Sequence, residues 1–157
     1  AEIQDGLEER GCLLLDRKAR VDQADGFKMA ISAGFKRIAV TVAGMNPQDA
    51  ACIRRLGKMQ GTRPLLLAVH TTGISETQAI VLAENCDLIW SCASKQVRQI
   101  AGKRACMQMG VSIPVFAMTL VGKRLLLNRA LHFPGPLAMH RAGLPLAPEE
   151  KQPDPLI

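Results

Sequence analysis

Short apolar runs of strand length alternate along this chain with segments long enough to form helices. Residues 38–42 are rich in β-branched side chains, residues 65–69 are apolar throughout, and residues 87–90 make a third run. An unbroken apolar run is typical of a strand buried on both faces, and parallel strands need a long crossover between them. The alternation therefore predicts right-handed βαβ units in a mostly parallel sheet.

Capping signals predict where the intervening helices begin. Serine, threonine and aspartate favour the N-cap, serine followed three residues later by glutamine makes a capping box, and proline favours the first turn. The expected start signals are Asp22, Pro47, Ser75 with Gln78, and Ser94. Gly34 and Gly102 are expected to end helices. Outside this frame we expect a short polar helix over residues 1–10, strands over 12–15, 106–109 and 115–118, and a last helix over 122–131.

These elements predict an α/β fold: a three-layer αβα sandwich of Rossmann-like type with helices on both faces of the sheet. The direction of the strand at 115–118 stays open, and Pro114 before it favours an edge position. Six of the nine prolines fall in the last 24 residues. We therefore expect one domain over residues 1–131 and an extended or disordered Pro-rich tail over 132–157. The tail either wraps on the domain or on a partner, or is loose.

Composition narrows the cellular setting. With 157 residues, 48% of them hydrophobic, the chain can bury a single core, and no apolar run reaches the roughly 20 residues that span a bilayer. The start lacks the regions of a signal peptide, so we expect a soluble, cytoplasmic protein with no membrane contact. Five cysteines, an odd number without Cys-x2-Cys spacing, indicate reduced thiols and no metal site.

Basic residues concentrate in the middle of the chain. Residues 36–130 hold 13 basic and four acidic side chains, within a net charge of +6. The pairs and triplets at residues 54–58, 95–98, 103–104 and 123–124 are expected on solvated outer helix faces. The alternative is attraction for an anionic ligand or for nucleic acid. Aromatic residues make up only 3% of the chain, so stacking of nucleic acid bases is disfavoured.

Ligands of open parallel sheets bind beyond the carboxyl ends of the strands, where helix N-termini point their amides. Residues 43–46, 70–73 and 91–95 follow strands at that edge, and 110–112 form a further candidate loop. Hydroxyls, helix amides and one ammonium suit an anion. The candidate ligand-binding residues are Thr71, Thr72, Gly73, Ser94, Lys95 and Ser112. For Ser94 an ordinary N-cap role is the simpler alternative.

Cys92 is the candidate nucleophile. It precedes an expected helix N-terminus and lies three positions before Lys95, and both effects would lower a thiol pKa. His70, which ends the apolar run at 65–69, is the candidate base. The simpler alternatives are a small buried filler for Cys92 and a loop hydrogen bond for His70.

No cofactor motif accompanies these loops. Gly-x-Gly-x-x-Gly, Gly-x4-Gly-Lys-Ser/Thr and Gly-x-Ser-x-Gly are all absent, so standard dinucleotide, P-loop and hydrolase sites are disfavoured and the cofactor stays undefined. Asp22 and Asp25 precede a helix and are interpreted as capping residues.

Five stretches carry a resemblance to a known family: residues 19–23, 36–42, 69–73, 92–95 and 110–117. The chain resembles, over about residues 12–131, the methanogenesis marker protein eight family, which is typical of methanogenic archaea and has no assigned reaction. Members are longer at the N-terminus, so the resemblance implies a C-terminal domain. It supports the named loops as a shared site.

Two hypotheses about function follow. In the first, the chain is a small-molecule or anion-binding α/β domain whose loops line one pocket, with Cys92 and His70 able to act in catalysis. In the second, it is a non-catalytic accessory or assembly module, whose basic helices and Pro-rich tail bind a protein partner.

Overall fold

A computed structural model describes residues 2–146 and shows a mixed α/β fold. Most elements lie within a few residues of the positions expected from the capping signals and apolar runs. The elements are α1 Glu2–Glu9, α2 Gln23–Ser32, β1 Ala39–Ala43, α3 Pro47–Met59, β2 Leu65–Val69, α4 Glu76–Asn85, β3 Leu88–Trp90, α5 Lys95–Val97, the π-helix η1 Arg98–Gly102, β4 Met107–Met109, β5 Val115–Ala117 and α6 Leu120–Ala130.

The five strands form one sheet in the order β1-β2-β3-β5-β4. β1, β2 and β3 are parallel, with Ala39 opposite Leu65 and Leu67 opposite Leu88. β5 is antiparallel to both of its neighbours, β3 and β4. The sheet is therefore mixed: a parallel half comes from the two βαβ units, and the other half is built around one reversed strand.

The edge position expected for the strand after Pro114 is wrong, because β5 lies inside the sheet between β3 and β4. Only the short loop 110–114 joins β4 to β5, which is too short for a crossover and makes the pair a hairpin. Pro114 stands before the first residue of the strand, where it needs to donate no ladder bond, and its carbonyl accepts from Ser91 N at 2.9 Å.

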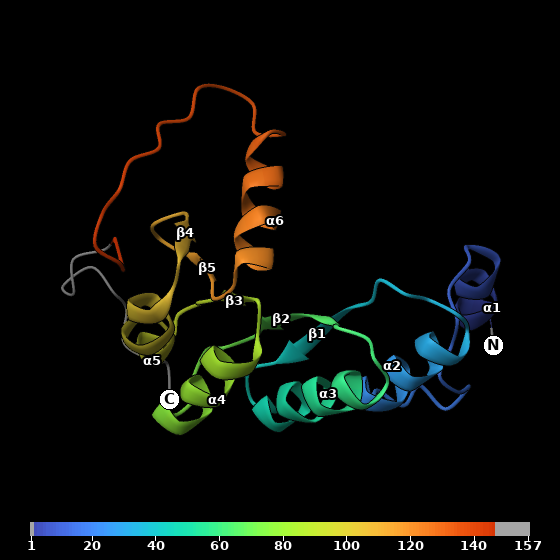
Figure 1. The fold of residues 1–157 in the computed structure, drawn as a ribbon. Coiled ribbons are helices and arrows are strands. Elements are labelled where there is room, and N and C mark those ends of the chain that lie inside the picture. Colours follow the sequence, from blue (N-terminus) through green and yellow to red (C-terminus); the bar gives the residue numbers. More distant parts are fainter. Residues whose placement is uncertain (1, 147–157) are drawn as a thin grey trace.

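Helices cover the two faces of the sheet unequally (Figure 1). The main core lies on one face, where α2, α3, α4 and α5 pack side chains such as Phe27, Ile53, Leu82 and Val97 against the sheet. On the other face a smaller cluster joins Leu126 of α6 to β3 and β5. The opposite face of β1 and β2 has no described helix over it, so α6 alone makes the third layer.

The expectation that residues 38–42 are buried on both faces is wrong, because no described helix covers one face of β1. Ala39 and Thr41 are exposed, whereas Val42 is completely buried. β1 is an edge strand in the described part of the sheet, and its ladder with β2 uses only one side. A strand that is apolar by composition is thus half-exposed by position.

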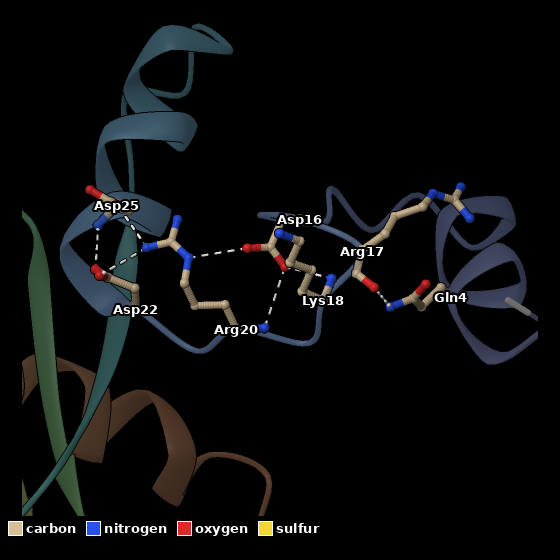
Figure 2. A network of polar contacts seen from close by, with 7 residues as sticks. All are labelled: Gln4, Asp16, Arg17, Lys18, Arg20, Asp22 and Asp25. Atoms are coloured by element: carbon tan, nitrogen blue, oxygen red, sulfur yellow. Dashed lines mark hydrogen bonds and ion pairs between the residues drawn. The ribbon is translucent and has the colours of Figure 1, made fainter.

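The strand expected at residues 12–15 is absent: this segment is an irregular connection. No strand of the described part of the chain pairs with it. Polar contacts anchor the connection after it (Figure 2). Arg20 donates from Nε to Asp16 at 3.1 Å and from Nη1 to Asp25 at 2.9 Å. Asp22 accepts from the Asp25 amide at 2.8 Å, which confirms its N-cap role.

A buried carboxylate joins four segments at the opposite end of the strands from the candidate loops. Asp87, only 1% exposed, accepts from Arg54 Nη2, from Arg63 Nη2 at 3.2 Å, from Leu66 N at 3.0 Å and from Thr119 Oγ1 at 2.7 Å. Burial raises its pKa, but the hydrogen bonds from Thr119, Leu66 and Arg54 outweigh that effect and hold the pKa below its usual value. Asp87 therefore binds β3 to α3, β2 and the start of α6 as an ionised group.

The tail leaves α6 and returns to the far edge of the sheet, beside β4 (Figure 1). Residues 132–146 have no regular secondary structure, but Leu144 and Pro145 are half-buried, and Leu146 N donates to Gln108 Oε1 at 2.9 Å. This part of the tail wraps on the domain itself. The rest of the expected tail, residues 147–157, lies outside the described residues.

Candidate functional site

The structure brings the predicted loops together at the carboxyl ends of the parallel strands. Thr71 Oγ1 donates to Trp90 O at 2.7 Å, and Ala93 N donates to Thr72 Oγ1 at 3.4 Å, so the loops after β2 and β3 are bonded to each other. A Cβ on Gly44 would lie 2.9 Å from Thr71 Cα. This close approach, which only glycine permits, places the loop after β1 against the same site.

Two residues of the site hold left-handed backbone conformations that disfavour any side chain. His70, the first residue after β2, has φ 53°. Cys92, the second residue after β3, has φ 45°. Such conformations cost of order 1–3 kcal/mol and persist where the surrounding structure enforces them, often at functional sites. His70 is exposed and Cys92 is half-buried. The sequence singled out both residues but held no sign of their strain.

The small polar residues of the site are largely used inside the protein. Thr71 and Ser94 are fully buried. Ser94 Oγ accepts from Val97 N at 3.2 Å, which confirms the N-cap alternative for this residue. Lys95 is exposed in the first turn of the helix that Ser94 caps. Ligand binding by Thr71, Thr72, Gly73, Ser94, Lys95 and Ser112 stays a prediction.

Arg98 is the residue that sequence reasoning missed. It was expected on a solvated helix face, but it is only 1% exposed. Its Nη2 donates to Cys92 O at 2.9 Å and to Ser112 O at 3.2 Å, so one guanidinium joins the loops before α5 and before β5. Its Nη1 is buried and has no hydrogen-bond partner among the described residues. Burial also lowers the pKa of Arg98.

Helix geometry explains why Arg98 points inward. It follows the buried Val97 directly and begins η1, a π-helical turn that ends at the fully buried Ala101 and Gly102. A π-turn rotates the helix face relative to regular α-helical spacing, and such turns occur frequently at functional sites. The available sequence signal was weak: Arg98 lies four residues after the N-cap Ser94, on the side of the helix that carries buried residues.

The cysteines differ sharply in environment. All five are free, and Cys12 and Cys106 are exposed. Burial raises the pKa of Cys86 to about 12, so this thiol is unreactive in the folded protein. Within residues 2–146 there is no group of three or more His, Cys, Asp or Glu side chains placed to hold a metal ion. Nor does this part of the chain contain a helix long and apolar enough to cross a membrane.

Arg98 is a buried cation with no carboxylate partner among the described residues. A buried arginine is a charge that needs a partner, because an uncompensated guanidinium in a protein interior is costly. Carbonyl oxygens of Cys92 and Ser112 satisfy Nη2 but carry no formal charge. The positive end of Arg98, together with exposed Lys95 nearby in sequence, gives this edge of the sheet a cationic character.

Fold and loops together define an α/β protein with a mixed five-stranded sheet and converging loops at its carboxyl edge. The chain belongs to the archaeal family described as "Uncharacterized protein conserved in archaea (DUF2099)", which matches residues 1–131. It is 36% identical over 157 residues to the uncharacterized protein MJ0054 of Methanocaldococcus jannaschii, covering 99% of this chain and 53% of that relative. The chain thus spans about half the length of the relative. No solved structure matches it.

Proposed function

We propose that this domain binds a small anionic ligand at the loops after β2 and β3, with Arg98 as the buried cation that attracts it. The observation that carries this proposal is the buried Nη1 of Arg98, which has no hydrogen-bond partner among the described residues, while Nη2 of the same guanidinium donates to Cys92 O. In a low-dielectric setting such a donor gains more from an anion than an exposed lysine does. Lys95, His70 and Thr72 line the approach to the loops in this proposal.

Cys92 and His70 supply the catalytic form of the same proposal. The left-handed backbone of both residues holds them on neighbouring loops that the Thr72 to Ala93 bond joins. A thiolate there would act as nucleophile and the imidazole as base. Alkylation of Cys92 at pH 7 tests this directly: a rate no faster than that of free cysteine removes it as an activated thiol.

A thermal-shift screen tests the anion site. The ligands are nucleotides, phosphorylated metabolites, small thiols and sulfonates at modest salt. A ligand at about 100 times its Kd adds roughly 2.7 kcal/mol, which raises the Tm by about 5–10 °C in a chain of this size. We expect the shift to disappear in Arg98→Gln and to shrink in Lys95→Ala, because each substitution removes a cation from the site.

The matched control is Lys103→Ala, which removes an exposed cation just after η1. It should keep the full ligand-induced shift. Arg98→Gln changes the packing of a buried site as well as its charge. Arg98→Lys is therefore measured beside it, because lysine retains the positive charge. If ligands shift all variants equally, or shift none of the proteins, the anion site at these loops is wrong.

We further propose a link to methanogenesis, a cytoplasmic location and a Rossmann-like architecture. A role linked to methanogenesis is supported by the resemblance of five sequence stretches and by the methanogenic source of the relative. A cytoplasmic location is supported by the five free cysteines. A Rossmann-like three-layer sandwich over residues 1–131 is supported by helices on both faces, although α6 alone forms the third layer.

The second candidate is an accessory module that binds a protein partner. One observation favours it: within residues 2–146, no strand pairs with the outer edge of β1 and no helix covers its outer face. Leu65 N donates to Ile38 O, and Gly44 N donates to Val69 O. The backbone N–H and C=O groups of the even-numbered residues of β1 therefore point toward β2. The backbone amides of Ala39 and Thr41 point away from β2, toward the open edge. An extended segment of a partner would add a strand there. Two results together would favour this candidate. No anion would stabilise the chain, and Thr41→Pro would abolish binding of the partner.

A further inference from the structure

A cavity lies between the returning tail and the edge strand β4. Its volume is about 700 Å³, which is in the range of sites that enclose small organic molecules. Three segments line it: residues 106–108 at β4, Lys123 of α6, and the tail from Met139 to Leu146. None of the residues in the first candidate site contributes to this cavity.

The tail is held across the cavity by specific contacts. Leu146 N donates to Gln108 Oε1 at 2.9 Å, and Gln108 Nε2 in turn donates to Gly110 O at 2.8 Å, which orients the amide. At Gly102 an added Cβ would lie 3.2 Å from Pro145 Cβ, so the tail packs closely on η1. The tail thereby crosses the edge of β4, which would otherwise be an open strand edge.

Two cationic side chains from separate segments, Lys123 and Arg141, line the cavity, with His140 beside them. Among residues 2–146, no lining residue is Asp or Glu. Lys123 is half-buried on α6, while His140 and Arg141 are exposed on the tail. A set of basic groups from two separate segments, without a counter-ion among the lining residues, attracts an anion.

Beside these groups and the Gln108 amide, much of the lining is apolar. Met107, Met139, Leu144 and Leu146 contribute hydrocarbon and thioether surface. Burial of such surface favours a ligand that carries an apolar body, at about 25 cal/mol for each Å² removed from water. An inorganic phosphate would satisfy the cations but leave this surface wet, so an ion alone fits the cavity poorly.

We propose that residues 139–146 form a strap that closes this cavity, and that the cavity binds an organic anion with an apolar body. The acidic head of the ligand pairs with Lys123 and Arg141, and its apolar part packs on the methionines and leucines. Cys106 lies exposed in the wall and donates from Sγ to Ala117 O at 3.3 Å. Its thiol therefore reports on occupancy of the cavity.

Two fluorescent probes that differ only in charge test the proposal on the whole chain. Anilinonaphthalene sulfonate carries the anionic head, and phenylnaphthylamine is its neutral counterpart. We expect Lys123→Ala and Arg141→Ala each to weaken binding of the sulfonate about tenfold, because each removes one charge-assisted contact. The matched control, Arg124→Ala, removes the exposed neighbour of Lys123 on the same helix and should leave the Kd unchanged.

Protection of Cys106 locates the bound probe. A saturating concentration of the sulfonate should slow alkylation of Cys106 by iodoacetamide at least fivefold, while exposed Cys12, outside the cavity, keeps its rate. Unprotected Cys106 would place the probe elsewhere and overturn the proposal, as would equal effects of Lys123→Ala and Arg124→Ala. Lys95→Ala should not change probe binding, so this test and that of the first site fail independently.

Discussion

Replacement of Asp87 by asparagine is the perturbation whose effect the structure determines best. The variant keeps the size of the side chain but removes its charge. Arg54 then loses a carboxylate partner while its Nε and Nη1 still donate to Asn85 O at 2.7 Å and Pro64 O at 2.5 Å. Thr119 Oγ1 and Leu66 N also lose a charged acceptor.

The expected cost is about 3 kcal/mol of unfolding free energy. Breaking a buried ion pair by removing one partner costs roughly 3–5 kcal/mol, and the low end applies because the Arg54 side chain keeps 21% exposure. In a chain of this length that loss lowers the Tm by roughly 10 °C. Urea unfolding followed by circular dichroism measures it, with an unchanged m value as the sign of a pure stability effect.

Acid titration checks the same reasoning by a second route. The pKa of Asp87 is lowered from its usual 3.8 in the folded state. Its contribution is therefore fully present above the unfolded pKa and is lost as pH falls through the folded value. Below about pH 4 the wild type should lose stability more steeply than Asp87→Asn, because the variant has no ionised carboxylate at this position to lose.

The control is Glu84→Gln, which neutralises an exposed acid on α4. A surface change of this kind should stay within about 0.5 kcal/mol. If Asp87→Asn costs no more than Glu84→Gln, the four hydrogen bonds to Asp87 do not hold the ends of the strands together, and the account of this cluster is wrong.

One further substitution test and one labelling test follow from packing and burial. Gly122→Ala should lower the free energy of unfolding in urea by about 1–3 kcal/mol, because the new Cβ would lie 2.2 Å from Asp87 O. The control Gly26→Ala on α2, where nothing lies within 4 Å of the new Cβ, should stabilise the protein slightly. Equal effects of the two substitutions would contradict the packing of α6 on β3. Cys86, with its pKa raised to about 12, should resist iodoacetamide at pH 8 until urea unfolds the chain. Exposed Cys12 should react at once. Fast labelling of Cys86 in the native protein would show that β3 opens locally.

The positions of most elements could be predicted because their signals are local. Asp22, Pro47, Ser75 and Ser94 act within one helical turn, and each begins a helix in the structure or caps it. The same local reasoning was wrong at residues 12–15, where an apolar run has no strand to pair with. A strand exists only if a neighbour completes its hydrogen bonds, and a single segment holds no information about neighbours.

The candidate site divides in the same way. That the loops after β2 and β3 lie at one edge follows from parallel strands and could be predicted, and the bond between Thr72 and Ala93 confirms the proximity. Arg98 could not be placed, because whether a helical arginine faces solvent or the core depends on the π-turn and on the loop at Ser112, 14 residues away. Its spacing in sequence resembled that of an ordinary surface cation.

The sequence by itself determined the alternation of strands and helices, the caps and the basic character of the middle of the chain, since these depend on residue types and short-range geometry. Only the tertiary structure decided which sheet face stays uncovered, that β5 runs antiparallel inside the sheet, that Asp87 and Arg98 are buried charges, and that the tail returns to β4. Each of these depends on contacts between segments far apart in the chain, where burial, register and electrostatics are set by partners that no local pattern specifies.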